Sequence, residues 1–270
     1  MLQYPSSIVL IGAGHMATHM LNGLKLAGFP LNALHVTDMD EEKLRAIAEQ
    51  FQVKTSTDNS AAIKQAAIVI LAIKPQSIRD FAEQTRAAFA HDPLVVSILA
   101  GIPLEKLHQL LGVQNIVRAM PNICVSIAQG NTILCAPHLE ASASRTIEAL
   151  FSLMGVTQWV QDEAELDAYT VLTGAGPGYV FYLLQNIIDA AAALGIQELE
   201  AKKAVLQLFA GATQLALNSP ASLHTLQQQV TSKKGVTEQV IQTLADGQLE
   251  ALFAEAFKKA YAHGQQLQHL

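Results

Sequence analysis

Cysteine is scarce in this chain, since Cys124 and Cys135 are the only two among its 270 residues. They form no CxxC pair and stand beside no cluster of histidines. This pattern argues against a disulfide framework and against a zinc site. We therefore expect no metal centre, and a reducing compartment such as the cytoplasm.

Charge and long apolar runs are also sparse. Charged residues make up 15% of the chain and its net charge is −6, so no basic surface is evident for a nucleic-acid partner. No apolar run reaches the roughly 18 residues that suggest a membrane span, and the first residues lack the basic segment of a secretory leader. Half of the residues are apolar, which allows one large or two medium domains, and we expect two.

Two patterns alternate over the first 160 residues. Short, continuous, β-branched apolar runs predict buried strands of a parallel sheet. Helix-like stretches such as "DEEKLRAIAEQF" and "SIRDFAEQTRAAF" lie between them. The strand-like runs are "SIVLI", "ALHVTD", "AAIVILAIKP", "PLVVSILAG", "NIVRAMPN" and "NTILCAP". The alternation predicts an α/β fold, with a doubly wound parallel sheet over residues 1–160.

The pattern changes near Gln161. Stretches such as "YVFYLLQNIIDAAAALGI" and "LEALFAEAFKKAYAHGQQL" carry apolar residues at three- and four-residue spacing and contain no strand-like run. We therefore expect an all-helical domain over residues 161–270. About 110 residues of such apolar helices cannot cover all of their own surface, so we predict a homodimer formed through this domain.

A glycine-rich turn, "GAGHMA", follows the first predicted strand and precedes a predicted helix. Gly12 permits a tight turn, Gly14 lets the backbone approach a pyrophosphate, and Ala17 permits close packing of helix on strand. The start of the helix adds partial positive charge. Glycines in such a turn are structural in some proteins, but the strand and helix around this one favour a Rossmann-type dinucleotide site.

Asp38 ends the second predicted strand, and two interpretations of it stay open. An acid at this place accepts hydrogen bonds from an adenosine ribose and repels a 2′-phosphate, which favours NAD. Alternatively Asp38, like Asp40, caps the helix that begins at Glu41. Lys43 and Arg45 lie nearby, and we interpret them as surface charges of that helix.

Two further strand ends carry candidate ligands, because ligands of doubly wound sheets bind beyond the carboxyl ends of the strands. In "ILAIKP", Ala72 and Pro75 would keep the backbone near the cofactor, and Lys74 would meet a phosphate or a ribose. In "IVRAMPN", Met120 and Asn122 would border the nicotinamide. The alternative is that the prolines only end the strands.

Taken in order, these motifs resemble those of the pyrroline-5-carboxylate reductases over nearly the whole chain. The resemblance is carried by "IGAGHMA", "STDN", "ILAIKP", "VVSILAGIPLEKL", "IVRAMPN", "TGAGPGYVFYLLQNIIDAAAALG" and "VTSKKGVT". It implies an NAD(P)H-dependent reductase of a cyclic imine that acts in proline synthesis. It also implies helical domains that interlock as a dimer and complete each other's substrate sites, and a larger homo-oligomer stays open. The family mostly uses NADPH and often accepts NADH.

The resemblance also implies cofactor residues. Asn59 would touch the adenosine side, while Ala72, Lys74, Pro75, Met120 and Asn122 would line the nicotinamide side. The glycine turn would hold the pyrophosphate through Gly12, Ala13, Gly14, His15, Met16 and Ala17.

For the substrate, a small imine with a carboxylate, the resemblance points to two segments. One is "TGAGPGY", where Thr173, Gly174, Ala175 and Gly176 precede Pro177. Pro177 suits the first turn of a helix, and a helix N-terminus suits an anion. The other is "TSKKGVT". There Thr237 would hydrogen-bond the ring nitrogen, and backbone N–H groups near Ser232 and Gly235 would hold the carboxylate.

This second segment departs from the family pattern Ser-Pro-Gly-Gly-x-Thr, because Lys233 and Lys234 replace the proline and the first glycine. The fixed φ of proline and the access of glycine to φ > 0 are lost, so we expect the loop to follow another path. Two other functions stay open. One is a related imine or β-hydroxyacid-type oxidoreductase, although "YVFYLLQNIIDA" lacks the catalytic lysine usual there. The other is a non-enzymatic dinucleotide sensor.

Overall fold

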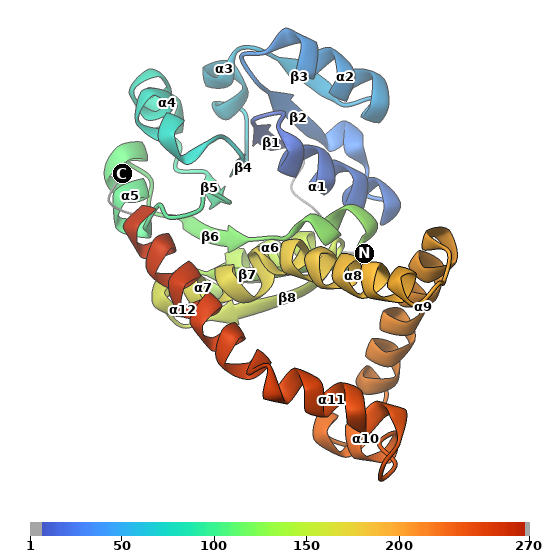
Figure 1. Cartoon of the computed structure of the whole chain (residues 1–270). Helices are drawn as coiled ribbons and strands as arrows, with labels where there is room; N and C mark the ends of the chain where they lie inside the picture. Colours follow the sequence, from blue (N-terminus) through green and yellow to red (C-terminus); the bar gives the residue numbers. More distant parts are fainter. Residues whose placement is uncertain (1–6, 268–270) are drawn as a thin grey trace. The chain divides into compact units, whose positions relative to one another are not determined.

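The computed structural model describes residues 7–267, and its first part forms one eight-stranded sheet of order β3-β2-β1-β4-β5-β6-β7-β8 (Figure 1). All neighbouring strands are parallel except β6 and β7, which are antiparallel. The strands are β1 (Ile8–Ile11), β2 (Leu34–Thr37), β3 (Lys54–Ser56), β4 (Ile68–Leu71), β5 (Leu94–Ser97), β6 (Ile116–Met120), β7 (Gly130–Cys135) and β8 (Gly155–Val160). The predicted α/β fold is confirmed, and the reversal of β7 is its one departure from a wholly parallel sheet.

The sheet is doubly wound because alternate residues of its central strands pack under different helices. Ile8 and Leu10 of β1 share one apolar cluster with residues of three helices: α1 (His15–Leu26), α2 (Glu41–Phe51) and α6 (Ala141–Ser152). Val9 and Ile11 share a second cluster with three others: α3 (Asn59–Ile63), α4 (Ile78–Thr85) and α5 (Leu104–Leu111). Burial on both faces explains why these strands are apolar without alternation.

Two strands, β3 and β8, were not predicted. β3 is the edge strand Lys54–Ser56, three residues without an apolar side chain. In β8 half-buried and exposed positions alternate and only Val160 is buried, since the strand also lies at an edge of the sheet. Neither strand has the continuous apolar run by which the central strands are recognised.

Beyond β8 the described chain is helical. Asp162 caps α7 (Glu163–Tyr169) by accepting the N–H of Glu165. A π-helical turn (Thr170–Gly174) joins α7 to α8 (Gly176–Ala193). The helices that follow are α9 (Glu198–Leu217), α10 (Leu223–Gln229), α11 (Val236–Asp246) and α12 (Leu249–Leu267).

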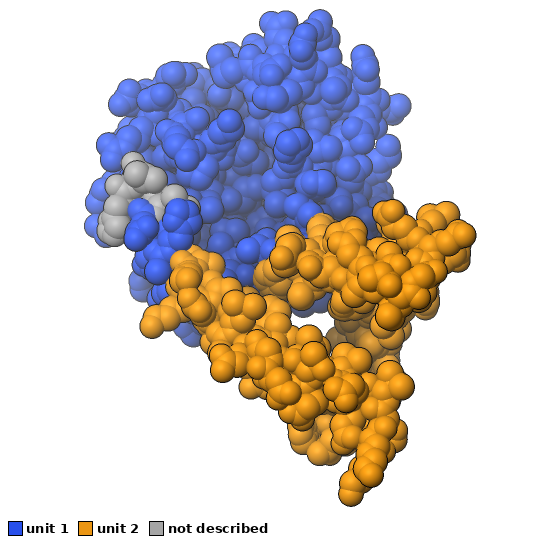
Figure 2. Space-filling model, viewed as in Figure 1, with its two compact units in different colours: residues 1–177, 261–270 blue, residues 178–260 orange. Residues whose placement is uncertain are grey.

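By their internal contacts the residues form two compact units (Figure 2). The first ends at Pro177 and takes in the end of the chain from Tyr261, and the second runs from Gly178 to Ala260. The boundary predicted between residues 160 and 161 falls at the end of β8. Because α7 and the π-helical turn pack on the sheet strands and on each other, they belong to the first unit.

The second unit has a small core and a large apolar surface. Its buried cluster consists of Leu184, Ile188, Ala201 and Val205. Large apolar side chains such as those of Phe181, Leu208 and Leu217 are exposed, at 57%, 61% and 76%. Exposed apolar surface of this extent is typical of a protein interface.

None of the helices in residues 7–267 has the length and apolar character needed to cross a membrane.

Candidate active site

The glycine turn between β1 and α1 has the geometry of a dinucleotide cradle. The N–H of Gly12 donates to the carbonyl of Thr37 at 2.6 Å, and its φ is +107°, which side-chain-bearing residues rarely adopt. A Cβ atom at this position would lie 2.6 Å from the carbonyl oxygen of Ala72. Gly14 is the N-cap of α1 and offers no side chain to the first N–H groups of the helix. A phosphate can therefore reach them.

Beside this turn lies a pocket of about 430 Å³ at the carboxyl ends of β1, β2 and β4. The structure brings six predicted cofactor residues together in its wall: Gly12, Gly14, Asp38, Asn59, Ala72 and Lys74. Sequence reasoning did not assign Ile11, Thr37, Met39, Ile73, Ser77, Asp80, Phe81 and Gln84, which also line it, and it interpreted Lys43 as a surface charge. Asp80, Phe81 and Gln84, which come from α4, belong to no recognisable sequence motif, so their place in the pocket is known only from the fold.

The pocket fits a dinucleotide on two observations. Glycine is required at position 12, because a Cβ there would collide with the carbonyl oxygen of Ala72 in the pocket wall. In addition, Asn59 Oδ1 is buried without a hydrogen-bond partner in the described structure, and Asn59 lines the pocket. A buried acceptor of this kind is costly unless a ligand or water satisfies it. The adenosine side of a bound cofactor would supply the missing donor.

The other predicted cofactor residues lie around the pocket rather than in its wall. Ala13 and Ala17 are buried, and Ala17 packs α1 against the sheet. Met16 is half-buried at the edge of the same core, and His15 is exposed at the first position of α1. Pro75 lines a separate small pocket.

Asp38 is held by the backbone and does not cap α2. Its Oδ2 accepts the N–H of Ala13 at 2.7 Å, and its Oδ1 accepts the N–H of Asp40 at 2.9 Å. Asp40 is the N-cap, because it accepts the N–H groups of Glu42 and Lys43. The Asp40 carboxylate also hydrogen-bonds the Lys43 ammonium, which lowers the pKa of Asp40 and raises that of Lys43. The interpretation of Asp38 as a helix cap is thus wrong, while Asp40 has that role.

The end of β6 is joined to the segment "TGAGPGY". Asn122, 8% exposed, donates from Nδ2 to the carbonyl of Thr173 at 3.1 Å. Its Oδ1 accepts the N–H of Cys124, which orients the amide. Met120 lies in van der Waals range of the position that a Cβ on Gly174 would occupy. Two predicted ligand segments, 51 residues apart, therefore meet.

The start of α8 is not a free helix N-terminus. α8 begins at Gly176, so Pro177 is in its first turn as predicted. The N–H of Ala175, however, donates to the carbonyl of Thr170 at 2.9 Å across the π-helical turn. That N–H is occupied, so the expected anion site at a helix start loses this donor. Single π-helical turns occur often at functional sites.

In the second unit the loop before α11 keeps a glycine-like backbone in spite of its lysines. Lys234 has φ +60°, and its N–H donates to Glu238 Oε2 at 2.5 Å. Gly235 is the N-cap of α11, and a Cβ on it would lie 2.3 Å from Ser232 Oγ. The expectation that the loss of glycine at position 234 closes the φ > 0 region is therefore wrong. Thr237 is exposed on the first turn of α11.

Comparison with known proteins assigns a family. A family model described as pyrroline-5-carboxylate reductase dimerisation matches residues 163–267, and one described as NADP oxidoreductase, coenzyme F420-dependent, matches residues 7–101. The pyrroline-5-carboxylate reductase of Pseudomonas aeruginosa is 36% identical over 256 residues, 94% of this chain and 93% of that protein. The chain belongs to the pyrroline-5-carboxylate reductase family.

Solved structures of pyrroline-5-carboxylate reductases share the fold over the full chain. The one from Coxiella burnetii is 32% identical, has a TM-score of 0.89, and the match covers 97% of this chain and 98% of that one. The one from Streptococcus pyogenes is 25% identical with a TM-score of 0.86, covering 96% and 98%. The fold and the family expected from the motifs are confirmed.

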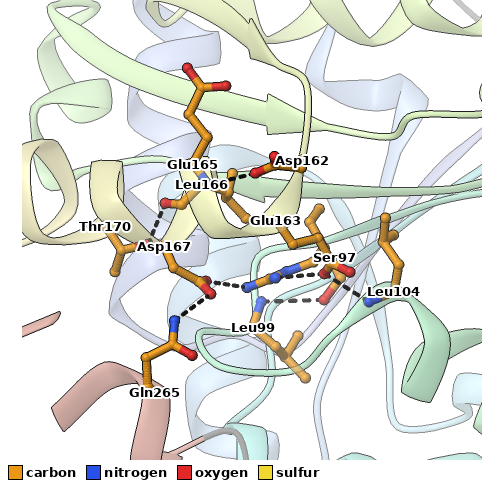
Figure 3. A network of polar contacts seen from close by, with 11 residues as sticks. Ser97, Leu99, Leu104, Asp162, Glu163, Glu165, Leu166, Asp167, Thr170 and Gln265 are labelled. Atoms are coloured by element: carbon orange, nitrogen blue, oxygen red, sulfur yellow. Dashed lines mark hydrogen bonds and ion pairs between the residues drawn. The ribbon is translucent and has the colours of Figure 1, made fainter. Parts of the chain in front are cut away.

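In this pyrroline-5-carboxylate reductase family member, a network of ion pairs and hydrogen bonds surrounds the buried guanidinium of Arg118 (Figure 3). Arg118 of β6, 2% exposed, contacts Glu163 Oε1 at 2.6 Å through Nη1 and Asp167 Oδ1 at 3.2 Å through Nη2. Glu163 Oε1 also accepts the N–H of Leu104, and Asp167 Oδ2 accepts from Gln265 of α12. The cluster ties the strand that ends at Met120 to α7, the helix that leads to Thr173.

Sequence reasoning missed this cluster. The available signal was Arg118 itself, a single charge inside the otherwise apolar strand "IVRAM", because a buried charge needs a partner. Cys135 of β7 is the residue opposite Arg118 in the pairing of β6 with β7. Burial of the Cys135 thiol, and secondarily the nearby Glu163 carboxylate, raise the pKa of the thiol to about 11. Cys135 is thus an unreactive core residue.

Proposed function

We propose that this chain reduces the C=N bond of 1-pyrroline-5-carboxylate to give L-proline, with NAD(P)H as the reductant. The observation that carries the proposal is similarity to pyrroline-5-carboxylate reductases over nearly the full length, together with a dinucleotide pocket that fits its ligand. NADP is supported by the NADP oxidoreductase model over residues 7–101 and by the Plasmodium falciparum relative, whose structure has NADP bound. NAD is the alternative, and the backbone-anchored carboxylate of Asp38 favours it.

The reaction needs a hydride at the imine carbon and a proton at the ring nitrogen. The nicotinamide supplies the hydride and leaves as NAD(P)⁺. The protein orients the imine and assists the proton, which requires no strongly basic residue. Thr237 is our candidate for the hydrogen bond to the ring nitrogen, because it matches the last threonine of the family's loop and is exposed on the first turn of α11.

The site residues follow from the placement of the motifs. The pocket residues would hold the adenosine and pyrophosphate, and the joined end of β6 would border the nicotinamide and the imine. In full, the cofactor residues proposed are Gly12, Ala13, Gly14, His15, Met16, Ala17, Asp38, Asn59, Ala72, Lys74, Pro75, Met120 and Asn122. The substrate residues proposed are Thr173, Gly174, Ala175, Gly176, Pro177, Ser232, Gly235 and Thr237.

A homodimer is part of this proposal. The dimerisation model covers residues 163–267, and the second unit exposes large apolar side chains that a partner would bury. We propose that the helical domain comprises residues 161–270, a division supported by the dimerisation model that begins at residue 163. A higher oligomer and a cytoplasmic location also remain proposals, the latter supported by free thiols at Cys124 and Cys135.

Nicotinamide oxidation with pyrroline-5-carboxylate tests the function. We expect turnover by the full chain, and a fall in kcat/KM of about 10- to 1000-fold in Thr237→Ala, as when a positioned donor is lost. Thr243→Ala is the matched control, because its hydroxyl bonds only to Gln239 of its own helix. Absence of turnover with tight cofactor binding would instead indicate a sensor, and turnover only of other imines or hydroxyacids a related oxidoreductase. An unchanged rate in Thr237→Ala would refute the role of the hydroxyl.

A further inference from the structure

Asp38 presents a fixed carboxylate to the pocket. Both oxygens are anchored, Oδ2 by the N–H of Ala13 and Oδ1 by the N–H of Asp40. A carboxylate oxygen accepts about two hydrogen bonds, so each keeps one acceptor site. Because one anchor lies in the glycine turn itself, the carboxylate stands at a set distance from the place where a pyrophosphate would bind.

Lys43, which also lines the pocket, and Arg45 each contact an acid at the start of α2, through pairs that are exposed to solvent. Lys43 Nζ lies 3.1 Å from Asp40 Oδ2, and Arg45 Nη2 lies 4.0 Å from Glu42 Oε1. Each pair is formed within the first turns of α2, whose start also carries Glu41. The end of β2 is therefore surrounded by acids and their own counter-ions.

Lys74 also lines the pocket, but it lies away from Asp38 along the carboxyl edge of the sheet. It follows β4, whereas Asp38 follows β2, and β1 lies between these two strands. Lys74 thus borders the pyrophosphate and nicotinamide side of the glycine turn. A 2′-phosphate beside Asp38 would carry a charge of about −1.5 to −2, would meet this carboxylate, and would have to compete with Asp40 for Lys43, the cation of α2 in the pocket wall.

We propose that Asp38 makes NADH the better cofactor of this chain and NADPH the weaker one. The free acceptor sites of the carboxylate bind the two hydroxyls of the adenosine ribose, an arrangement typical of acids at this place in the fold. A 2′-phosphate removes one of these donors and adds like charge. NADPH binds only if Asp38 turns away and gives up its backbone hydrogen bonds. This inference rests on the proposed function for the identity of the cofactor as a nicotinamide dinucleotide.

The experiment measures dissociation constants of the full chain for NADH and NADPH by fluorescence titration without substrate. We expect NADH to bind about 10-fold more tightly or better. Asp38→Asn keeps the size of the side chain but removes its charge and one acceptor. We expect it to shift the ratio of the two constants toward NADPH by about 10- to 100-fold. Asp38→Ser, which leaves more room, should shift the ratio in the same direction.

Glu41→Gln is the matched control, because it removes the same charge from an exposed position outside the pocket wall. Its ratio should stay within about 2-fold of the unsubstituted chain, since a solvated charge is screened. Using a ratio within each variant cancels any loss of folded protein. Tighter binding of NADPH by the unsubstituted chain, or an unchanged ratio in both Asp38 variants, would overturn the proposal.

These outcomes separate the inference from the function on which it rests. A chain that binds NADH more tightly but does not turn over pyrroline-5-carboxylate supports the role of Asp38 and refutes the proposed activity. A chain that turns over this substrate better with NADPH supports the activity and refutes the role of Asp38. If neither dinucleotide binds, both are refuted.

Discussion

Removing both carboxylates from the buried cluster should destabilise the protein far more than removing either one. Arg118 is 2% exposed and cannot lose its charge, while Glu163 and Asp167 are 31% and 15% exposed. After one substitution, Glu163→Gln or Asp167→Asn, the guanidinium still has a counter-ion. Because the amide oxygen of either variant still accepts a hydrogen bond from the guanidinium, we expect each single variant to lose about 1 kcal/mol of unfolding free energy.

The double variant leaves a buried cation without a counter-ion. Breaking a buried pair in this way costs about 3–5 kcal/mol. Glu163 is a third exposed, so water reaches its side of the cluster and the total should lie near the lower limit of that range. The loss of unfolding free energy in the double variant should therefore exceed the sum of the two single losses, about 3 against about 2 kcal/mol, because the second substitution removes the last neutralising group.

Urea unfolding followed by the fluorescence of Trp159, the single tryptophan, measures these losses. Trp159 lies in β8, three residues before Asp162, the cap of α7, so its signal reports on the first unit. Glu148→Gln removes an exposed carboxylate from α6 and should change stability by less than about 0.5 kcal/mol.

Adding Arg118→Met to the double variant supplies the decisive measurement. This substitution removes the buried cation that has no counter-ion, and methionine is similar in size to arginine, so much of the lost stability should return. A triple variant no more stable than the double one would show that the guanidinium charge is not the cause, and the reasoning would fail.

Three further changes test other parts of the structure. Gly12→Ala should weaken binding of NADH in titration by about 10-fold or more, since a Cβ meets the Ala72 carbonyl and φ is positive; an unchanged affinity would contradict the cradle. Lys234→Gly should raise unfolding free energy by about 0.5–1 kcal/mol, because glycine carries no left-handed penalty; a lower urea midpoint would contradict this. Burial, and secondarily Lys54, lower the pKa of His35. The unfolded chain then binds the proton first, so stability should fall as pH drops below 6.5, and His35→Asn should flatten that dependence of the urea midpoint.

The sheet and the glycine turn were predictable because their physical causes are local. Continuous apolar runs mark strands buried on both faces, and glycine at position 12 marks a backbone that no other residue adopts easily. The reversed direction of β7 was not predictable in this way. Its segment "TILC" is buried like the parallel strands, and strand direction depends on the connection rather than on the side chains.

The roles of single polar residues were the harder part. Asp38 and Asp40 both precede α2, and only the path of the turn decides which one caps the helix and which one reaches the glycine turn. The partners of Arg118 follow it by 45 and 49 residues. Lys234 kept its φ because Glu238 accepts its N–H, a compensation four residues away. Each outcome depends on contacts that a local pattern does not contain.

The bond between Gln265 and Asp167 has a consequence for synthesis of the chain on the ribosome. The first unit is completed by residues from the last helix, 98 positions after Asp167. Domains generally fold as they emerge, but this dinucleotide-binding half cannot close its buried cluster until almost the whole polypeptide has been made. Nascent chains stalled before Tyr261 should therefore already contain the sheet and yet lack the Asp167 contact that α12 supplies.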